Sequence, residues 1–173
     1  MSRPRESPRK RSRAAALQVL FSLEFGGRKP DAAPGPARPI AALDASRALP
    51  DELDLARVQV AFDEVGAHFE LPEGARAFAK ELVFGVASHR RELDSWIAEQ
   101  ARNWRLDRMA SVDRNVLRLG SYELLHTDAP VAVVIDEAVE LARRFGGDRS
   151  PAFVNGVLDA LASRIRPEAE RRR

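Results

Sequence analysis

The chain has 173 residues, of which 45% are hydrophobic, 28 are Lys or Arg, 26 are Asp or Glu and none is Cys. This length predicts one domain, and the lack of cysteine excludes disulfide frameworks, thiolate metal sites and cysteine nucleophiles. No apolar run reaches the roughly 20 residues of a membrane span, and the N-terminus lacks the apolar stretch of a secretory signal. We therefore expect a cytoplasmic protein that does not enter a membrane.

The charge is distributed unevenly along the chain. Residues 1–13 hold six Arg or Lys and one Glu, and residues 164–173 hold five Arg and two Glu. Because the whole chain carries +2, these local charges of +5 and +3 leave −6 on the residues between them. We predict flexible basic tails at 1–13 and 167–173 around a helical domain at 14–166. Such tails are typical of proteins that bind polyanions, although tails that only aid solubility have the same composition.

The first predicted helix, residues 14–25, is apolar on nearly all sides, which suits a helix buried against several others. It ends at Gly26-Gly27, where a segment of different composition begins. Of the 25 residues at 26–50, fifteen are Gly, Ala or Pro, and five of the chain's eleven prolines are among them. Because proline forbids both a continuous helix and ladder pairing, this segment predicts a loop inserted in the domain.

Everything after the insert has helical periodicity. One long helix is predicted for residues 75–101, with apolar side chains and His89 on one face and Gly85 at a close crossing. Ser150-Pro151 is a strong start signal, an N-cap followed by proline at the first helical position. The other predicted helices cover residues 54–69, 105–125 and 130–147. No segment shows the two-residue hydrophobic periodicity of a β-strand, so the pattern predicts an all-α bundle of five to seven helices.

The histidines give little support for a metal site. Glu123-x-x-His126 has the spacing that di-iron bundles use, but those sites need the motif twice and the chain has it once. His89 lies on an apolar stripe, where a hydrogen-bonded packing histidine is the expected role. We predict no metal site and no cofactor.

Acidic residues cluster in the helix predicted at 130–147, where Asp136 and Glu140 share a face. Arg143 and Arg144 follow one turn later, which favours helical ion pairs over acid–base catalysis. The sequence also lacks a Gly-rich phosphate loop and a serine-centred elbow. We therefore predict that the chain is not an enzyme.

The last helix contains FVNG, which places Asn155 and Gly156 in a helix interior although both are poor helix formers. On a wheel of about 100° per residue, the buried face is predicted to comprise Val154, Val157, Leu158, Leu161 and Ile165. Phe153 lies at the edge of this face, near the helix N-terminus. Two alternatives stay open: Phe153 stacks on a base of single-stranded RNA, or a neighbouring helix covers it. For Asn155 we expect a polar cap or network, and for Gly156 the close approach of another helix.

The chain contains, in this order, RKRSRAAALQVLFSLEF, NVLRLGSYELL, IDEAVELARRFG and FVNGVLDALA. Together these segments resemble the NusB family of bacterial transcription antitermination factors, over residues 9–25 and about 75–166. The resemblance implies an all-helical fold of about seven helices that binds RNA without catalysis. It also implies pairing with NusE, a small-subunit ribosomal protein, to recognise the boxA element of ribosomal RNA operon leader transcripts and help RNA polymerase to resist termination. Some members of the family form homodimers.

The resemblance further implies functional residues. The RNA-associated positions of the family map onto Arg9, Lys10, Arg11, Arg13, Asp148, Ser150 and Phe153. Contacts with NusE are expected around Phe21, Asp113 and Arg114. Two departures from the family pattern are the long insert at 26–50 and Asp136, which stands where the family often has Asn. The alternative is a helical protein-interaction or dimerisation module whose basic tails are incidental.

Overall fold

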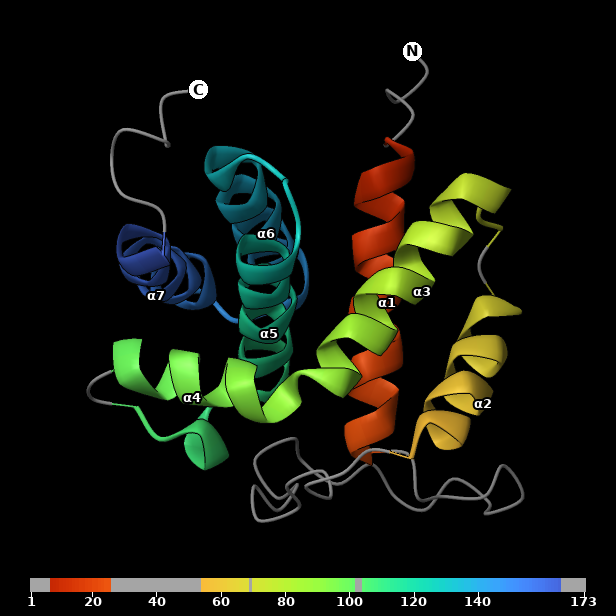
Figure 1. Ribbon diagram of the computed structural model, residues 1–173, viewed down its shortest axis with the longest axis horizontal. Helices are drawn as coiled ribbons and strands as arrows, with labels where there is room; N and C mark the ends of the chain where they lie inside the picture. Colours follow the sequence, from red (N-terminus) through yellow and green to blue (C-terminus); the bar gives the residue numbers. More distant parts are fainter. Residues whose placement is uncertain (1–6, 26–53, 69, 102–103, 166–173) are drawn as a thin grey trace.

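A computed structural model describes residues 7–25, 54–68, 70–101 and 104–165. Within these ranges the chain forms seven α-helices and one 3-10 turn and no strand, which confirms the all-α prediction (Figure 1). The predicted insert at 26–50 and the predicted tail at 167–173 lie outside the described residues. The elements are α1 (Pro8–Phe25), α2 (Leu55–Gly66), α3 (Glu73–Ser88), α4 (Arg90–Gln100), the 3-10 turn η2 (Leu106–Arg108), α5 (Ser111–His126), α6 (Val131–Phe145) and α7 (Ser150–Ile165).

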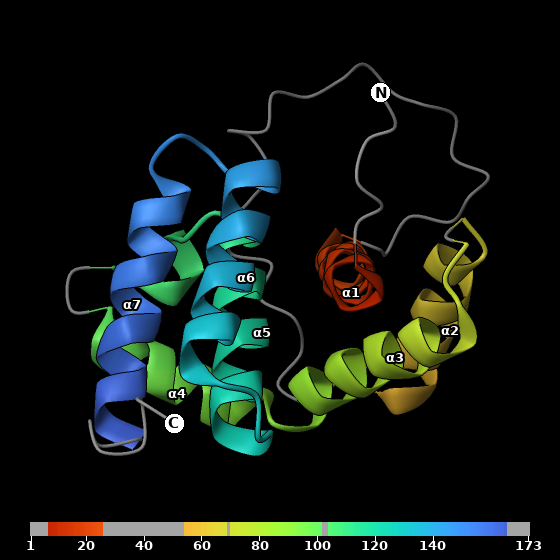
Figure 2. The same cartoon turned by 90° about the horizontal axis from the view of Figure 1, so that it is seen from above.

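Four helices surround α1, which Figure 2 shows end-on between α2 and α3 on one side and α5 and α6 on the other. Its side chains are buried around most of its circumference, as the apolar composition predicted. Small alanines let neighbouring helices approach closely, and the leucines fill the space between them. The buried apolar residues of α1 are Ala14, Ala15, Ala16, Leu17, Val19, Leu20 and Leu23.

Helix α7 packs on α4, α5 and α6 to form the other half of the molecule. The predicted buried face of this helix is confirmed, since Val154, Leu158 and Leu161 are fully buried and Ile165 is half-buried. None of the helices in the described ranges is long and apolar enough to cross a membrane.

Several predicted boundaries are wrong. The basic segment at 8–13 is not a flexible tail, because α1 already begins at Pro8. The long helix predicted at 75–101 breaks at His89, whose backbone has φ −109° and ψ 15°. The bend lets α3 pack on α1 while α4 packs on α5 and α7, so one continuous apolar stripe covers two different surfaces (Figure 1).

Two further starts differ by a few residues. The helix predicted from residue 105 begins only at Ser111, and η2 precedes it. Helix α7 begins at Ser150, and the N–H of Phe153 donates to the carbonyl of Arg149, so Arg149 and not Ser150 occupies the N-cap position. Pro151 therefore stands at the second helical residue.

The close crossing predicted at Gly85 is confirmed. A Cβ on Gly85 would lie 2.0 Å from Cζ of Tyr122, so the ring of this α5 residue rests directly on the α3 backbone. Burial, together with the charge of Glu81, raises the pKa of the Tyr122 phenol, which therefore stays neutral. Gly120 on α5 receives Leu158 of α7 in the same way, with 2.6 Å to its Cδ1.

The structural roles predicted for Asn155 and Gly156 are wrong. Both residues are exposed on α7. Within the described part of the chain, Asn155 has no hydrogen-bond partner, and a Cβ on Gly156 would meet no atom within 4 Å. Packing inside this chain therefore explains neither residue.

Candidate nucleic-acid interface

The first turns of α1 present basic side chains to solvent, but each has a neighbour. Arg9 is exposed, with its guanidinium carbon 4.9 Å from the ring centre of Phe78 on α3. Lys10 lies with its Nζ 3.5 Å from Oε1 of Glu137 on α6. Arg11 donates a hydrogen bond to the carbonyl of Glu70. These three cations are accessible, and their contacts are the solvent-screened kind that contributes little to stability.

Arg13 differs from these three because it is buried. Its Nε and Nη2 donate to the two carboxylate oxygens of Glu123 on α5, at 2.8 and 2.6 Å, and Glu137 lies 3.6 Å from Nη1. Burial lowers the pKa of Arg13, but the hydrogen bond and charge of Glu123, helped by Glu137, outweigh it and raise the pKa above its ordinary value. The bidentate pair fixes α1 against α5 and leaves Arg13 no free donor face for a phosphate.

The turn between α6 and α7 holds two of the predicted RNA residues. Asp148 is exposed, whereas Ser150 is buried and its hydroxyl oxygen accepts the N–H of Gly147 at 2.9 Å. Ser150 therefore shapes the turn. Arg149, which the sequence reasoning missed, is exposed between them, and no acidic partner for it occurs in the described ranges.

Phe153 is half-buried and packs against the core, but one side of its ring faces Trp104. The two ring centres are 5.6 Å apart with planes inclined by 56°. Trp104 is 58% exposed and was not among the predicted site residues. The available signal was a lone aromatic residue in the polar run RNWRLDR, which periodicity does not place in the core. Other side chains thus cover Phe153 in part, and it belongs to an accessible aromatic pair, while its stacking on a base stays a prediction.

The two predicted RNA regions lie on either side of α6, which Figure 2 shows between α1 and α7. Glu137 of α6 meets Lys10 and Arg13, so α6 anchors the basic turns of α1. Near the C-terminal end of α6, Arg143 pairs with Glu140 as the charge pattern predicted, and Arg144 lies 5.0 Å from the ring centre of Phe145. The surface across α1, α6 and the start of α7 is therefore rich in cations but not uniformly positive.

The residues predicted to meet NusE lie at the opposite end of α1. Phe21 is 39% exposed, and its ring centre is 4.5 Å from that of Phe25. Arg114 is buried and does not offer a free cation, because its Nε and Nη2 donate to Glu24 at 3.1 and 2.9 Å. Asp113 is half-buried, and its Oδ1 has no hydrogen-bond partner in the described part of the chain.

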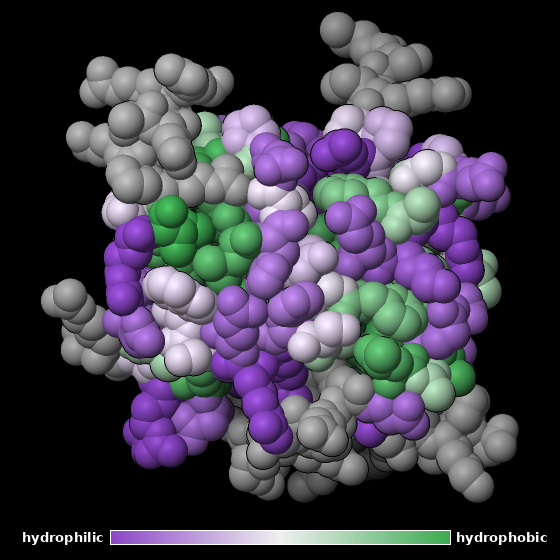
Figure 3. All heavy atoms as spheres, in the orientation of Figure 1, coloured by the Kyte–Doolittle hydropathy of each residue, from purple (hydrophilic) through white to green (hydrophobic). Residues whose placement is uncertain are grey.

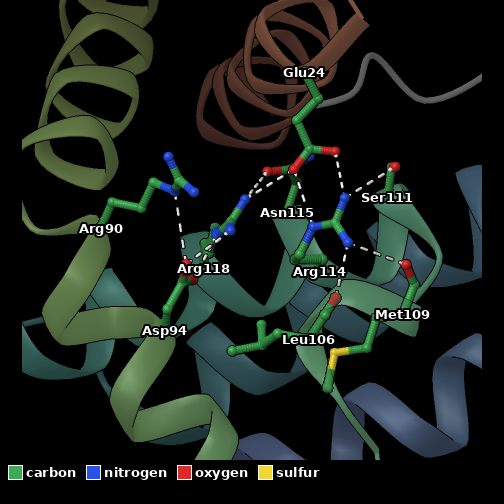
Figure 4. Close-up of polar contacts among 9 residues, drawn as sticks. All are labelled: Glu24, Arg90, Asp94, Leu106, Met109, Ser111, Arg114, Asn115 and Arg118. Atoms are coloured by element: carbon green, nitrogen blue, oxygen red, sulfur yellow. Dashed lines mark hydrogen bonds and ion pairs between the residues drawn. The ribbon is translucent and has the colours of Figure 1, made fainter. Parts of the chain in front are cut away.

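Arg114 belongs to a buried ionic network that Figure 4 shows. Glu24 of α1 accepts from both Arg114 and Arg118 of α5, the latter at 2.8 Å. Arg118 also donates two hydrogen bonds to Asp94 of α4, at 2.7 and 2.9 Å. The network joins three helices, so Arg114 holds the end of α1 that carries Phe21 in place.

Large apolar side chains are rarely exposed in the described ranges. On the face that Figure 3 shows, one apolar patch lies over α7 and another over the side of α2 and α3, and hydrophilic residues separate the two patches. Both Phe21 and Trp104 are among these few exposed residues. An exposed aromatic residue near each functional region is consistent with two separate contact surfaces.

The NusB family model matches residues 10–163. The transcription antitermination protein NusB of Anaeromyxobacter sp. (strain Fw109-5) is 42% identical over 163 residues, which cover 94% of this chain and 95% of the relative. Among solved structures, T. maritima NusB matches with a TM-score of 0.68 at 32% identity, over 95% of this chain and 97% of that chain. A structure of antitermination factors NusB and NusE in complex with dsRNA matches with a TM-score of 0.64 at 26% identity, over 91% and 97% of the two chains.

These relatives are non-catalytic transcription factors, in agreement with the prediction that the chain is not an enzyme. The family model, the curated relative and the solved structures all span nearly the whole chain and agree with one another. The chain belongs to the NusB family of transcription antitermination proteins.

Proposed function

We propose that this chain binds single-stranded boxA RNA of ribosomal RNA operon leader transcripts together with NusE. It acts in the cytoplasm as part of an RNA polymerase antitermination complex. The observation that carries the proposal is the pair of accessible features flanking α6, namely the cations of α1 and the Trp104–Phe153 pair. The solved complex of a related NusB with NusE and dsRNA supports both kinds of partner.

Within this proposal, the RNA residues divide into two roles. Arg9, Lys10 and Arg11 meet the phosphates, because their side chains can leave weak surface contacts at little cost. Arg13 positions these residues by holding α1 on Glu123 and does not itself contact RNA.

Bases of a single strand stack on the aromatic pair, because every base offers a π-face to an exposed ring. Trp104 provides the accessible surface, and Phe153 supports it from behind. Ser150 shapes the adjoining turn, from which Asp148 offers an acceptor to base amino groups and Arg149 a further cation.

The NusE surface is proposed around Phe21 at the other end of α1. The ring pair with Phe25 offers apolar area, and Asp113, which precedes Arg114 on α5, adds negative charge. Arg114 supports this surface through Glu24 without being exposed. The net −6 between the basic ends of the chain also favours a ribosomal protein, since such proteins are typically basic.

The proposal is tested by fluorescence anisotropy with labelled boxA RNA and a scrambled RNA of equal length, each with and without NusE. Wild type should prefer boxA, and NusE should tighten this complex. Trp104→Ala and Phe153→Ala should each weaken boxA binding by about 5- to 150-fold, because a stacked base contributes about 1–3 kcal/mol. Val60→Ala, an exposed apolar residue of α2, is the control and should bind like wild type.

Phe21→Ala separates the two surfaces. It should leave binding of boxA by the chain alone unchanged and reduce the tightening by NusE. If wild type binds boxA and scrambled RNA equally and NusE has no effect, the alternative of an interaction module with incidental basic tails is favoured. Sedimentation equilibrium of the same samples shows whether the chain, like some of its family, forms a homodimer.

A further inference from the structure

Three ligand-bearing side chains that are not among the proposed RNA or NusE contacts form a cluster. His89 stands at the junction of α3 and α4, Glu92 in the first turn of α4, and His126 at the end of α5. One ligand atom from each lies within 4.8 Å of the others. We propose that these three residues bind a divalent transition-metal ion of the Zn²⁺ class.

The geometry already resembles part of a coordination shell. Nε2 of His126 is 3.1 Å from Oε2 of Glu92. Two ligands at about 2.0–2.1 Å from a tetrahedral zinc ion are about 3.3 Å apart, so an ion fits between these atoms with a small adjustment. Glu92 is about half exposed and His126 is at the surface, so both side chains have the freedom to adjust.

His89 is held in the tautomer that a metal needs. Its Nδ1 donates to the carbonyl of Gly85 at 2.9 Å, as expected for a packing histidine, and this leaves Nε2 with a free lone pair. A ligating histidine typically donates its other ring N–H to such an oxygen, which fixes the ring and increases its basicity.

Contacts between neighbouring rings further restrict how the two histidine side chains can be oriented. The ring centres of His89 and His126 are 4.1 Å apart, and Tyr122 stacks on His126 at 5.3 Å with planes inclined by 24°. Beside the cluster, Nε of Arg90 lies 3.6 Å from Oδ2 of Asp94 (Figure 4).

The sequence spacing suggested Glu123-x-x-His126 as a metal-binding pair, but we predicted no metal site. The proposed site uses His126 but not Glu123. In Glu123-x-x-His126 the glutamate is occupied by Arg13, so His126 finds its carboxylate on α4, 34 positions away in the sequence. Long-range pairing, which spacing cannot reveal, assembles the cluster.

The donor set selects the class of ion. Two neutral imidazoles and one carboxylate favour zinc, cobalt or nickel over magnesium or calcium, which prefer oxygen ligands alone. Binding displaces the proton that Nε2 of His126 now donates to Glu92, and this proton goes to Nδ1 or to solvent. A bound ion would join the junction of α3 and α4 to the end of α5.

Isothermal titration calorimetry of the untagged full chain with Zn²⁺ tests the site. We expect one ion per chain in wild type. Glu92→Gln and His126→Gln each remove a direct ligand. Each should therefore reduce the affinity for Zn²⁺ by more than the roughly 10- to 100-fold that is typical when an outer-shell partner of a metal site is replaced. His68→Gln is a matched control: Nδ1 of His68 also lies 2.9 Å from the carbonyl four residues earlier, that of Glu64, but His68 is outside the cluster.

Two further readouts keep the result interpretable. Co²⁺ should give visible absorption bands in wild type and His68→Gln that are absent in both cluster variants. Zn²⁺ should raise Tm in wild type and His68→Gln only. Far-UV circular dichroism verifies folding, and the exposed position of Glu92 makes Glu92→Gln decisive if His126→Gln is unfolded. No saturable Zn²⁺ binding to wild type, or equal affinity in wild type and Glu92→Gln, overturns the proposal.

Discussion

Arg13 shows that one residue in a basic run can differ in role from its neighbours. Its neighbours Arg9, Lys10 and Arg11 reach solvent, whereas the guanidinium of Arg13 lies between α1, α5 and α6. Arg9 and Arg13 are about one helical turn apart and therefore share a face of α1, with guanidinium carbons 4.9 and 5.4 Å from the ring centre of Phe78. Arg9 lies in the exposed first turn, whereas Arg13 lies deeper, where α5 and α6 cover it. At this scale the basic sequence combines a binding function with a structural one.

Removing the carboxylate charge opposite Arg13 tests the structural role. Glu123→Gln should lower the free energy of unfolding by about 3–5 kcal/mol, because it leaves a buried guanidinium without its main counter-charge. The measurement is urea unfolding followed by circular dichroism. Glu140→Gln, whose partner Arg143 is exposed, is the matched control and should change stability by about 0–1 kcal/mol. Equal losses in the two variants would contradict the burial argument.

At the scale of helices, contacts between elements decide which glycines matter. Gly85 lies where α5 crosses α3, and its missing side chain makes room for the ring of Tyr122. Gly156 is exposed on α7 with open space beside it. Both occupy helix interiors in the sequence, so helix propensity alone treats them alike.

The two glycines should therefore respond with opposite signs to the same substitution. Gly85→Ala should lower the free energy of unfolding by about 1–3 kcal/mol through overpacking against Tyr122. Gly156→Ala should raise it by about 1 kcal/mol, because alanine is the better helix former and meets no neighbour. Chemical denaturation of both variants measures the difference. A loss in both would mean that the surface around Gly156 is not open.

The same scale explains why the break at His89 could not be predicted. The apolar stripe runs without interruption from Leu82 through His89 to Ile97, and no proline marks a boundary. The bend arises because α3 and α4 pack on different helices, and this information lies in other parts of the chain. Helix order and the buried face of α7 follow from local periodicity, so these were predictable.

At the scale of the whole molecule, charge separates the ends of the chain from its body. The cations of α1 add to a field that attracts RNA, while the net −6 between the basic ends of the chain limits binding to regions where cations gather. The affinity for RNA should therefore depend strongly on the salt concentration, and a few cationic residues should account for most of this dependence.

Replacing Arg9, Lys10 and Arg11 together by Gln tests this dependence. If each contacts one phosphate, the slope of log K against log salt should become less negative by about 2, from roughly 0.7 per contact on a single strand. Anisotropy titrations between low and physiological salt give the slope. Arg105 pairs with Asp107 and follows Trp104 in the chain. Replacing Arg105 by Gln should change the slope by no more than the roughly 0.7 that corresponds to one phosphate contact. An unchanged slope in the triple variant would remove α1 from the interface.

The site was only partly predictable for the same reason as the fold. The positions implied by resemblance include accessible residues such as Phe21 and Asp148, but also the buried Arg13 and Arg114. A list of positions does not distinguish a residue that contacts a ligand from one that supports it. Trp104 comes near Phe153 only through the packing of the folded chain, across 49 positions of sequence, so no local pattern links them.

The pairing of Arg13 with Glu123 also determines an order of events during synthesis on the ribosome. The two residues are 110 positions apart. At roughly 5–20 residues per second, Arg13 is synthesised about 5–20 s before its partner on α5. During this interval α2 and α3, which also pack on α1, are synthesised, but the side of α1 that faces α5 and α6 has no partner. The first helix to be synthesised is thus fully enclosed only after α5 and α6 have been made, and until then its uncovered apolar side is a site where the nascent chain can aggregate.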